Sequence, residues 1–256
     1  MSPFRIVKVG GDLLENEIRF NEFIHAFSSI EGKKILVHGG GKEASRLLDA
    51  LKIPVKYHEG RRITDAKTME IVTMVYGGLI NKNVVAQLQA IGVSAIGMAG
   101  CDGDIINAHK RIVDKIDYGF AGDIDYVNAN ILIKLMGAGL VPVICPLTHD
   151  GQGQLLNTNA DTITSEIGVA LSLKGRVKLH YCFGINGVLR DFDDKESVIE
   201  ELDEPTFQQL RSEGNISAGM IPKLTNAFNA IKGGVSKVTI GNHTHFIQSS
   251  GYTTIL

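Results

Sequence analysis

The sequence predicts an α/β fold, a three-layer sandwich in which helices cover both faces of a mostly parallel central sheet. Short apolar runs alternate along the chain with stretches of helical periodicity, which is typical of parallel strands joined by crossover helices. Two successive runs end in glycines just before a helical stretch, a common form of strand-to-helix turn. With 256 residues, 44% of them hydrophobic, the chain can bury a full core.

The larger lobe of the predicted fold covers residues 1–173. Its first two strands end in Lys8-Val9-Gly10-Gly11 and in His38-Gly39-Gly40-Gly41. Pro54 ends the helix after the second strand, and Thr64-Asp65 can cap a long helix that runs towards Ala90. In order, the chain predicts a strand at 4–9, a helix at 17–30, a strand at 35–37, a helix at 43–51, an extended segment at 55–63, a helix at 65–90 and a strand at 93–98.

Beyond this point the pattern changes to hairpins over 105–127, followed by a helix at 130–136, a strand at 140–145, a turn at 150–153 and a helix from about 161 to 170. A smaller lobe, 174–256, is expected after Lys174-Gly175, with a strand at 177–181, helices at 205–211 and 219–232, and a strand at 237–240. No repeat or low-complexity linker separates the lobes. We therefore expect one domain over residues 1–256.

Charge and cysteine content narrow the class of protein. A net charge of -2 and the lack of any block of like charges argue against a nucleic-acid coat or a membrane-surface patch. The N-terminal residues lack the layout of a signal peptide, and no apolar run approaches the roughly 20 residues of a membrane span. Cys101, Cys145 and Cys182 are odd in number and widely spaced, so we expect them to fill apolar space in a cytoplasmic protein.

The three glycines after His38 predict an anion site, because a helix that starts in glycines presents bare backbone N–H groups. Gly39–Ala44 fits the dinucleotide pattern G-x-G-x-x-A, and the same segment is similar to the oxyanion hole of lipase-like hydrolases. The chain has neither the G-x-S-x-G elbow of those hydrolases nor a Walker A loop. A tight packing turn without a ligand is the remaining alternative.

Three charged residues adjoin turns of this kind. Lys8 lies near the end of the first strand, and Lys223 lies near the start of a helix after Gly219. Each could be an ordinary solvated lysine. Asp161 follows Asn157 and Asn159 at a helix start, where capping is the simplest role. Only together do they favour a site for a phosphoryl group.

Five segments, taken together and in this order, resemble the amino acid kinase family, and within it the kinases of N-acylated glutamate. The resemblance covers nearly the whole chain, from Val7 to Asn242. The segments are Lys8-Val9-Gly10-Gly11, His38-Gly39-Gly40-Gly41, Gly60-Arg61-Arg62-Ile63-Thr64, Asn157-Thr158-Asn159-Ala160-Asp161 and Gly219-Met220-Ile221-Pro222-Lys223.

This resemblance implies transfer of the γ-phosphoryl group of ATP to the side-chain carboxylate of an N-acyl-L-glutamate, acetyl or succinyl, in arginine biosynthesis. The carboxylate is already ionised at neutral pH, so no general base is needed. The difficulty is to bring two anions together and to stabilise the charge of the transferring group.

The resemblance also assigns roles to individual residues. Lys8 and Lys223 would be catalytic and would stabilise the phosphoryl oxygens, and Asp161 would fix their positions. Arg62 would hold the α-carboxylate of the substrate in two-pronged fashion. The remaining expected contacts are Asn157 and Asn159 with the acylated glutamate, Gly40 and Gly41 with the substrate and the moving phosphoryl group, and Gly10 and Gly11 with phosphate.

ATP with Mg²⁺ is expected as co-substrate, the ion held mainly by phosphate oxygens, with no prosthetic group and no dedicated protein metal site. The expected partners are the N-acylglutamate, ATP and a second copy of the chain, with neither nucleic acid nor membrane. In this interpretation residues 1–173 bind the acylglutamate and form a homodimer through the long helix at 65–90, and residues 174–256 bind the nucleotide. Because the chain starts only seven residues before Lys8, we expect no N-terminal helix of the kind that arginine-inhibited relatives use to form hexamers.

Two segments depart from the family pattern. Cys182-Phe183-Gly184 stands where relatives carry a Ser/Thr-Asp pair that contacts the nucleotide, and Gly100-Cys101-Asp102 replaces a Gly-Lys-Asp. The first change motivates one rival function, a non-catalytic ligand sensor on the same fold. A dinucleotide-dependent oxidoreductase is the other rival, but it rests on Gly39–Ala44 alone and leaves Lys8 and Lys223 unexplained.

Overall fold

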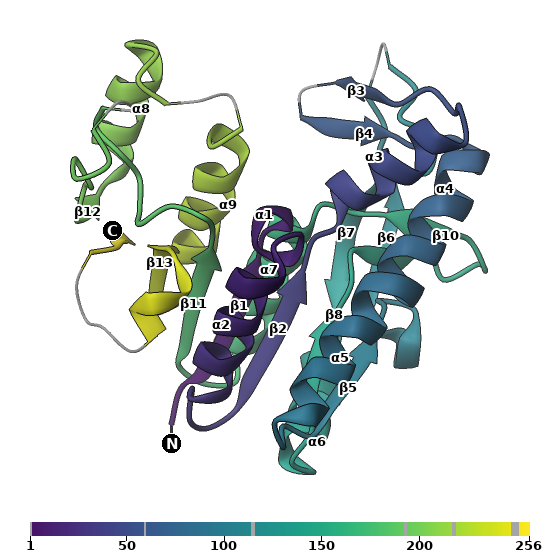
Figure 1. The fold of residues 1–256 in the computed structure, drawn as a ribbon, viewed down its shortest axis with the longest axis horizontal. Coiled ribbons are helices and arrows are strands. Elements are labelled where there is room, and N and C mark those ends of the chain that lie inside the picture. The colour runs from purple at the N-terminus through teal and green to yellow at the C-terminus, as the bar shows by residue number, and fades with distance from the viewer. Residues whose placement is uncertain (1, 59, 114–115, 192–193, 217–218, 247–250) are drawn as a thin grey trace.

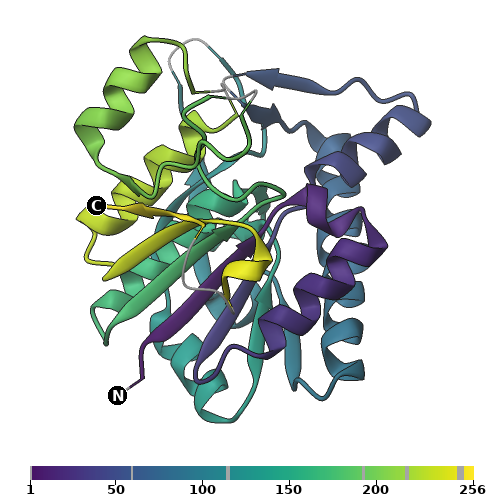
Figure 2. The ribbon, with the colours of Figure 1, turned by 60° about the vertical axis from the view of Figure 1, so that its left-hand side comes forward.

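The computed structural model describes residues 2–58, 60–113, 116–191, 194–216, 219–246 and 251–256. It contains one large central sheet with helices on both faces, so the predicted three-layer α/β sandwich is confirmed (Figures 1 and 2). The strand order of this sheet is β12-β14-β13-β11-β1-β2-β8-β5. Its strands are β1 (Phe4–Val9), β2 (Lys34–His38), β5 (Ala95–Met98), β8 (Val141–Ile144), β11 (Val177–Cys182), β12 (Glu201–Leu202), β13 (Lys237–Gly241) and β14 (Thr253–Ile255).

Most of the central sheet is parallel, as predicted, and the exception lies at one edge. β14 pairs antiparallel with β13, and β12 pairs parallel with β14, so the last two strands at this edge run against the rest. The sequence analysis did not anticipate either strand, because two or three residues are too few to show a period of alternation. The parallel strands all end at the same edge of the sheet, at the top in Figure 1.

Each central strand contributes side chains to the two hydrophobic cores, one on each face of the sheet, because successive side chains point to opposite faces. In β1, Ile6 belongs to the core under the helices α6 (Ala129–Gly137), α7 (Ala160–Ser172) and α9 (Ile221–Lys232). Val7 belongs to the core under α2 (Glu17–Ser28) and α3 (Gly41–Ala50). The same alternation places Lys8 on the α7 face.

The long helix predicted at 65–90 is present as three consecutive helical segments, α4 (Ala66–Val72), η1 (Thr73–Ile80) and α5 (Asn81–Ala90). The side chain of Asp65 caps its start by accepting a hydrogen bond from the Thr68 amide at 2.8 Å. The middle segment η1 is a π-helix, which the helical spacing alone did not reveal. It includes Tyr76 and Ile80, both of which approach Gly40.

The hairpins expected over 105–127 are confirmed for the described part of that range; residues 114 and 115 lie outside it. β6 (Ile106–Lys110) and β7 (Gly122–Val127) pair antiparallel, and they extend into a four-stranded sheet with β9 (Leu147–His149) and β10 (Leu155–Asn157). A two-stranded sheet, β3 (Lys56–His58) and β4 (Arg61–Ile63), lies beside them, on the right of Figure 1.

The remaining helices are short. They are α1 (Gly11–Leu14), η2 (Asp102–Asp104), α8 (Glu204–Ser212) and η3 (His243–Phe246). On the left of Figure 1, α8 and α9 lie near β12 and β13.

The three cysteines are free; Cys145 and Cys182 are buried as expected, whereas Cys101 is exposed, so the expectation that it fills apolar space is wrong. In the described residues, no helix has both the length and the apolar character needed to cross a membrane.

Candidate active site

A cavity of about 740 Å³ opens at the carboxyl ends of the central parallel strands, where ligands bind in open α/β sheets. Its lining residues come from segments along most of the chain, from Lys8 in β1 to Lys223 in α9. Every residue that the sequence analysis singled out for substrate, phosphate or catalysis lines it: Lys8, Gly10, Gly11, Gly40, Gly41, Arg62, Asn157, Asn159, Asp161 and Lys223.

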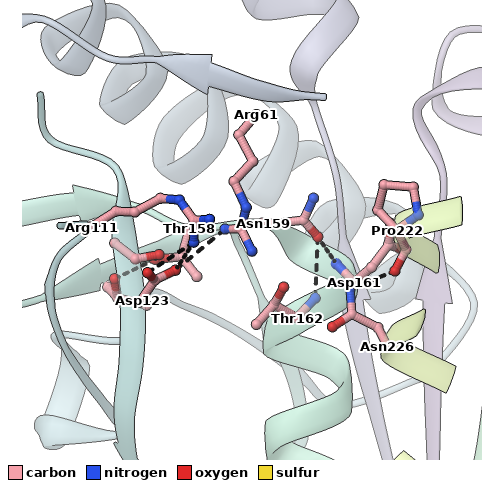
Figure 3. A network of polar contacts seen from close by, with 11 residues as sticks. Arg61, Arg111, Asp123, Thr158, Asn159, Asp161, Thr162, Pro222 and Asn226 are labelled. Carbon is pink, nitrogen blue, oxygen red and sulfur yellow. Dashed lines mark hydrogen bonds and ion pairs between the residues drawn. The ribbon is translucent and has the colours of Figure 1, made fainter. Parts of the chain in front are cut away.

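The Asp161 carboxylate lies between the two lysines. Lys8 Nζ is 2.9 Å from Asp161 Oδ1, and Lys223 Nζ is 3.3 Å from Asp161 Oδ2. The Lys8 and Asp161 side chains are each only 6% exposed, whereas that of Lys223 is 27% exposed. The capping function at the start of α7 belongs instead to Asn159, whose Oδ1 accepts hydrogen bonds from the amides of Asp161 and Thr162 (Figure 3). The Asp161 carboxylate is therefore free to bind both ammonium groups.

Burial and charge act in opposite directions on this group of three. Burial lowers the pKa of Lys8 below its ordinary value; the charge of Asp161 opposes that shift and the charge of Lys223 adds to it. Burial tends to raise the pKa of Asp161, but the two neighbouring ammonium groups outweigh burial and hold the pKa below its ordinary value. The arrangement is two cations around one ionised carboxylate.

Phe183 is a site residue whose role the sequence did not indicate. Its ring centroid lies 5.0 Å from Lys8 Nζ and 5.0 Å from Lys223 Nζ, so one aromatic ring contacts both ammonium groups. The ring is 8% exposed and also lines the cavity. It follows directly on β11, in the segment that departs from the family pattern.

The two glycine turns are joined at the strand ends. The Gly39 amide donates a hydrogen bond of 3.1 Å to the Val9 carbonyl, which holds the turn after β2 against the turn after β1. Gly40 must lack a side chain, because a Cβ atom there would lie 2.6 Å from Ile80 and 2.8 Å from Tyr76. α3 begins at Gly41, so its first backbone amides open into the cavity.

Arg62 lies across the cavity from the lysines and is 7% exposed. Its Nη2 donates hydrogen bonds to the Gly41 carbonyl and to Ser45 Oγ, both at 2.8 Å, and to the Tyr57 hydroxyl. Its guanidinium also lies over the Tyr57 ring, at 4.8 Å. Nη1 is buried and has no protein hydrogen-bond partner among the described residues. A buried, unsatisfied guanidinium N–H beside a cavity is suited to an anionic ligand.

Asn157 is the last residue of β10. Its Nδ2 donates to Thr64 Oγ1 at 2.9 Å, and that hydroxyl donates in turn to the Arg62 carbonyl at 3.1 Å. This chain of hydrogen bonds ties β10 to the loop after β4. It leaves the carbonyl oxygen of the Asn157 side chain available as an acceptor at the cavity wall.

His38 begins the glycine motif, but it points away from the cavity, into the core on the α5 side. Its Nδ1 donates to the Gly39 carbonyl at 2.7 Å, and its Nε2 accepts from Asn81 Nδ2 at 3.1 Å. Asn81 Nδ2 also donates to the Val143 carbonyl at 2.9 Å. Burial lowers the pKa of His38 to about 4, so the ring is neutral at pH 7. The role of His38 is to fasten the glycine turn to α5 and β8.

A second charged cluster, which includes the cavity-lining Arg61, lies at β4 and β7 (Figure 3). Arg111 Nη1 binds both oxygens of the Asp123 carboxylate, at 3.0 and 2.9 Å, and Arg61 Nη1 approaches the same carboxylate at 3.5 Å. Arg61 lines the cavity beside Arg62. The sequence analysis missed this cluster, because its members come from three separate segments.

A second cavity, of about 410 Å³, is formed by residues between Gly184, which follows Phe183 in the chain, and Met220. Its lining is mostly apolar with a few amide groups and one lysine: Gly184, Ile185, Asn186, Val188, Leu189, Lys195, Asn215, Ile216 and Met220. In the part of the chain that the structure describes, no three His, Cys, Asp or Glu side chains are grouped to hold a metal ion. His243 Nε2 lies 3.5 Å from Glu22 Oε2, whereas the His245 ring packs edge-on against the Tyr252 ring, so the two histidines have different partners.

Known proteins match this chain over most of its length, both in sequence and in fold. The model of the Amino acid kinase family matches residues 3–242. The acetylglutamate kinase of Bacteroides fragilis is 53% identical over 235 residues, which are 92% of this chain and 90% of the relative. That of Parabacteroides distasonis is 49% identical over 251 residues, 98% of each chain. Carbamate kinase from Giardia lamblia, at 12% identity, covers 100% of this chain and 98% of its own with a TM-score of 0.73, a likeness of fold.

Proposed function

This chain belongs to the amino acid kinase family, and on that basis we propose that it transfers the γ-phosphoryl group of ATP to the side-chain carboxylate of an N-acyl-L-glutamate. The product is an acyl phosphate, and the reaction is a step of arginine biosynthesis. Relatives that are about half identical are acetylglutamate kinases, which supports this activity. The single observation that carries the chemistry is the buried group in which Asp161 lies between Lys8 and Lys223.

The reaction needs positive charge and not a base. A carboxylate oxygen of the substrate attacks the γ-phosphorus, the bond from phosphorus to the β,γ-bridging oxygen breaks, and ADP leaves with the bonding electrons. In our proposal Lys8 binds phosphoryl oxygens on the acceptor side and Lys223 binds them on the donor side. Asp161 holds the two ammonium groups apart and takes no proton, since its neighbours keep it ionised.

Backbone amides complete the stabilisation of the moving group. Gly11 offers an amide after β1, and Gly40 and Gly41 offer amides after β2, on the two sides of the proposed phosphoryl position. The Gly10 amide already donates to the Cys182 carbonyl at 3.1 Å, so Gly10 lines the site without a spare N–H. Such donors are fixed by the fold and need no rearrangement during reaction.

The acceptor is bound on the opposite wall in this proposal. Arg62 holds the α-carboxylate, for which its unpartnered Nη1 provides a donor. Asn157 accepts a hydrogen bond from the N–H of the acylated amino group, and the side-chain amide of Asn159 contacts the same substrate. Residues 1–173 form this acceptor and dimerisation lobe, and residues 174–256 form the nucleotide lobe.

ATP is placed with its phosphates at Lys8 and Lys223 and with its adenosine in the cavity of the smaller lobe. The apolar wall there, with Ile185, Leu189 and Met220, suits a flat base, and Asn186 and Lys195 offer polar contacts. Mg²⁺ would accompany ATP, held mainly by phosphate oxygens, and would neutralise part of their charge. Because this segment replaces the family's Ser/Thr-Asp pair, the base is held by different contacts in this chain.

We further propose that the protein is cytoplasmic, since ATP is supplied in the cytoplasm, and that it forms a homodimer. The dimer surface is the long helix from Ala66 to Ala90, on which Met74 is 56% and Leu79 is 49% exposed. A hexamer in solution, with inhibition by arginine, would contradict this part of the proposal. Light scattering of the purified protein distinguishes the two states.

The rival functions explain less of the site. A dinucleotide-dependent oxidoreductase would account for the glycine turn but for none of the three charged residues Lys8, Asp161 and Lys223. A ligand sensor on the same fold has no need of a Lys8–Asp161–Lys223 group, whose value lies in stabilising a phosphoryl group in transfer.

Hydroxylamine trapping tests the proposal directly. The protein is incubated with ATP, Mg²⁺ and either an N-acylglutamate or free glutamate, and the acyl phosphate is captured as a hydroxamate. We expect hydroxamate with N-acylglutamate and little with free glutamate, and we expect Lys8→Ala and Lys223→Ala each to lower kcat by several powers of ten with a modest effect on KM. If no acylglutamate yields hydroxamate, the kinase function is wrong.

A further inference from the structure

Tyr181 is a buried residue whose neighbours line the active-site cavity. It lies in β11, is 0% exposed, and is paired in register with Lys8 of the adjacent parallel strand β1. Residues in register on adjacent parallel strands present their side chains on the same face of the sheet. Tyr181 therefore lies beside Lys8 on the face that α7 covers.

The hydroxyl of Tyr181 is directed at the backbone of Asp161. It donates a hydrogen bond of 3.1 Å to the Asp161 carbonyl oxygen, in the first turn of α7. The amide of the same residue donates to Asn159 Oδ1 at 2.8 Å. Side chains thus bind both backbone polar groups of Asp161, so the backbone of this residue is fixed from two sides.

The ring of Tyr181 lies parallel to the ring of Phe183. The two planes differ by 1° and the centroids are 6.4 Å apart, within the range of favourable aromatic contacts. Phe183 is the residue whose ring contacts the ammonium groups of both Lys8 and Lys223. The contact with Tyr181 therefore restricts the orientation of a ring that both lysines use.

Two partners of the lysines meet on this one side chain. Asp161 supplies the carboxylate that both lysines bind, and Phe183 supplies the aromatic face that both lysines contact. Tyr181 binds the first through its hydroxyl and packs against the second through its ring. A phenylalanine would fill the same space without burying a polar group, so packing alone does not account for the hydroxyl.

The hydroxyl of Tyr181 remains a donor because it keeps its proton. Burial raises the pKa of Tyr181 well above its ordinary value, and the negative charges of Asp161 and Glu166 raise it further. A protonated phenol can donate one hydrogen bond, and the Asp161 carbonyl accepts it. Tyr181 therefore acts on Asp161 through a fixed hydrogen bond and takes no part in proton transfer.

The charge of Lys8 depends on where the Asp161 carboxylate lies. Burial lowers the pKa of Lys8 and so does the charge of Lys223, whereas Asp161 is the main group that raises it and Cys182 adds a smaller effect. Lys8 Nζ now lies 2.9 Å from Asp161 Oδ1. Because the attraction between buried charges falls with distance, a carboxylate that moved away would leave the ammonium less stable.

We propose that Tyr181 is the positioning residue of the Lys8–Asp161–Lys223 group: its hydroxyl fixes the backbone of Asp161 and its ring fixes Phe183, so that both ammonium groups stay charged and in place for the phosphoryl group. This inference rests on the proposed function, because it assigns the support of the same charged group. Tyr181 itself touches neither the acceptor nor ATP in this arrangement.

Tyr181→Phe tests the hydroxyl, because it removes that group and keeps the ring. We expect kcat in the hydroxamate assay to fall about 5-fold at pH 7, with little change in KM for the acylglutamate. We also expect the alkaline limb of the kcat profile to move to lower pH, since Lys8 loses part of the support of Asp161. A residue that only packs would lower kcat by the same factor at every pH. The position of the limb does not depend on the folded fraction of a preparation.

Two further variants establish the route of this effect. In an Asp161→Asn background, Tyr181→Phe should shift the limb no further, because the hydroxyl acts through the carboxylate of Asp161. Tyr252→Phe is the matched control: it removes a phenol hydroxyl that accepts a hydrogen bond from Lys237 Nζ at 3.3 Å, outside the cavity. This control should leave both kcat and the limb unchanged.

Tyr181→Leu tests the ring. We expect it to lower kcat more than Tyr181→Phe does, because it removes the contact with Phe183 as well as the hydroxyl. In a Phe183→Leu background this additional loss should disappear. An additional loss that persists without the Phe183 ring would assign it to packing and would overturn the role of the Tyr181 ring.

A titration of Lys8 provides a measurement that does not depend on catalysis. The protein is labelled with carbon-13 at the lysine ε-carbon, and the Lys8 resonance is assigned by its loss in Lys8→Arg. We expect the pKa of Lys8 to be lower in Tyr181→Phe than in the wild type and to be unchanged in Tyr252→Phe. An unchanged pKa of Lys8 in Tyr181→Phe overturns the positioning role and leaves the kinase function standing. If the wild-type protein yields no hydroxamate, the kinase function falls, and the titration still decides whether Tyr181 positions the charged group.

Discussion

The Lys8 ammonium nitrogen lies 2.9 Å from Asp161 Oδ1, and water reaches almost none of either side chain. Lys8 comes from the end of β1, and Asp161 comes from the first turn of α7, so the contact joins the central strand of the sheet to the helix beneath it. A buried ion pair of this kind loses hydration on both sides, and breaking it by removing one partner is strongly destabilising. Because both residues line the cavity, we infer that the pair serves to position charge there.

We therefore expect Asp161→Asn to impair catalysis through Lys8. Without the carboxylate, Lys8 is buried beside Lys223 with no counter-charge, so its pKa falls further and the ammonium is lost at lower pH. We expect kcat at pH 7 to fall about 100-fold, equivalent to roughly 3 kcal/mol. The alkaline limb of the kcat profile should move to lower pH.

The pH profile of kcat from pH 6 to 10 checks this expectation. A residue that merely supports the fold would lower kcat at every pH by the same factor. An unshifted profile in Asp161→Asn would show that Asp161 does not control the charge of Lys8.

Arg62 should govern affinity for the acceptor. Its Nη1 has no partner among the described residues, whereas Nη2 is held by Gly41, Ser45 and Tyr57, so one side of the guanidinium is fixed and the other has a donor to spare for the proposed carboxylate. We expect Arg62→Ala to raise KM for the acylglutamate by about 30-fold or more, as for loss of a hydrogen-bonded charge pair of about 2 kcal/mol, with a smaller effect on kcat.

Steady-state kinetics with the acceptor varied at saturating ATP provide the measurement. Arg62→Lys retains the charge but not the planar fork and should lie between the wild type and the alanine variant. The carboxylate role fails if the KM of Arg62→Ala for the acceptor equals that of the wild type.

Phe183 should matter because its ring contacts both lysines at 5.0 Å. Each ammonium-to-ring contact contributes about 0.5–2 kcal/mol, depending on how fully water is excluded. Phe183→Leu keeps an apolar side chain of similar volume and removes the ring, and we expect kcat to fall about 10-fold. Phe183→Tyr keeps the ring and should recover most of this loss.

Kinetics with ATP varied, together with the melting temperature of each variant, discriminate this role from simple packing. Loss of packing would lower thermal stability in proportion to activity, whereas loss of the two ring contacts would lower kcat in a protein of nearly normal melting temperature. Equal kcat in the wild type and Phe183→Leu would rule out a part for the ring.

Much of this arrangement could be predicted from local sequence. The apolar runs before Gly10 and Gly40 place both turns at strand ends, and the polar residues from Asn157 to Asp161 place a carboxylate at a helix start. These are short-range signals, because periodicity and helix termini are properties of neighbouring residues. The parallel strands of the central sheet and its longer helices follow from them, whereas the set of residues lining the cavity was indicated by the resemblance to the amino acid kinase family.

The parts that could not be predicted depend on contacts between distant segments. Arg61 in β4 contacts Asp123 in β7, and His38 at the end of β2 contacts Asn81 at the start of α5, although the members of each pair are far apart in the sequence. The sequence separation within each pair matches no helical or strand period and no motif, so the contact could not be predicted from the sequence alone. Phe183 stands out in the sequence only as a departure from the family pattern. No pattern in its neighbouring residues indicates that Lys8 and Lys223 both contact its ring.

The buried His38 gives a prediction about stability and pH. Burial lowers its pKa to about 4 in the folded protein, against about 6.5 in an unfolded chain. Between these values the unfolded state binds a proton that the folded state does not, so stability rises with pH across this window and is lost on acidification from about 6.5 to about 4. The shift corresponds to a loss of about 3 kcal/mol in the free energy of unfolding.

Urea denaturation at pH 7 and pH 4.5 measures this loss. We expect the stability of His38→Gln to depend less on pH than that of the wild type, and we expect the exposed His25→Gln to match the wild type. A slope in His38→Gln equal to that of the wild type would assign the acid sensitivity to other groups, among which His180, whose pKa burial lowers to about 3, is the first to test.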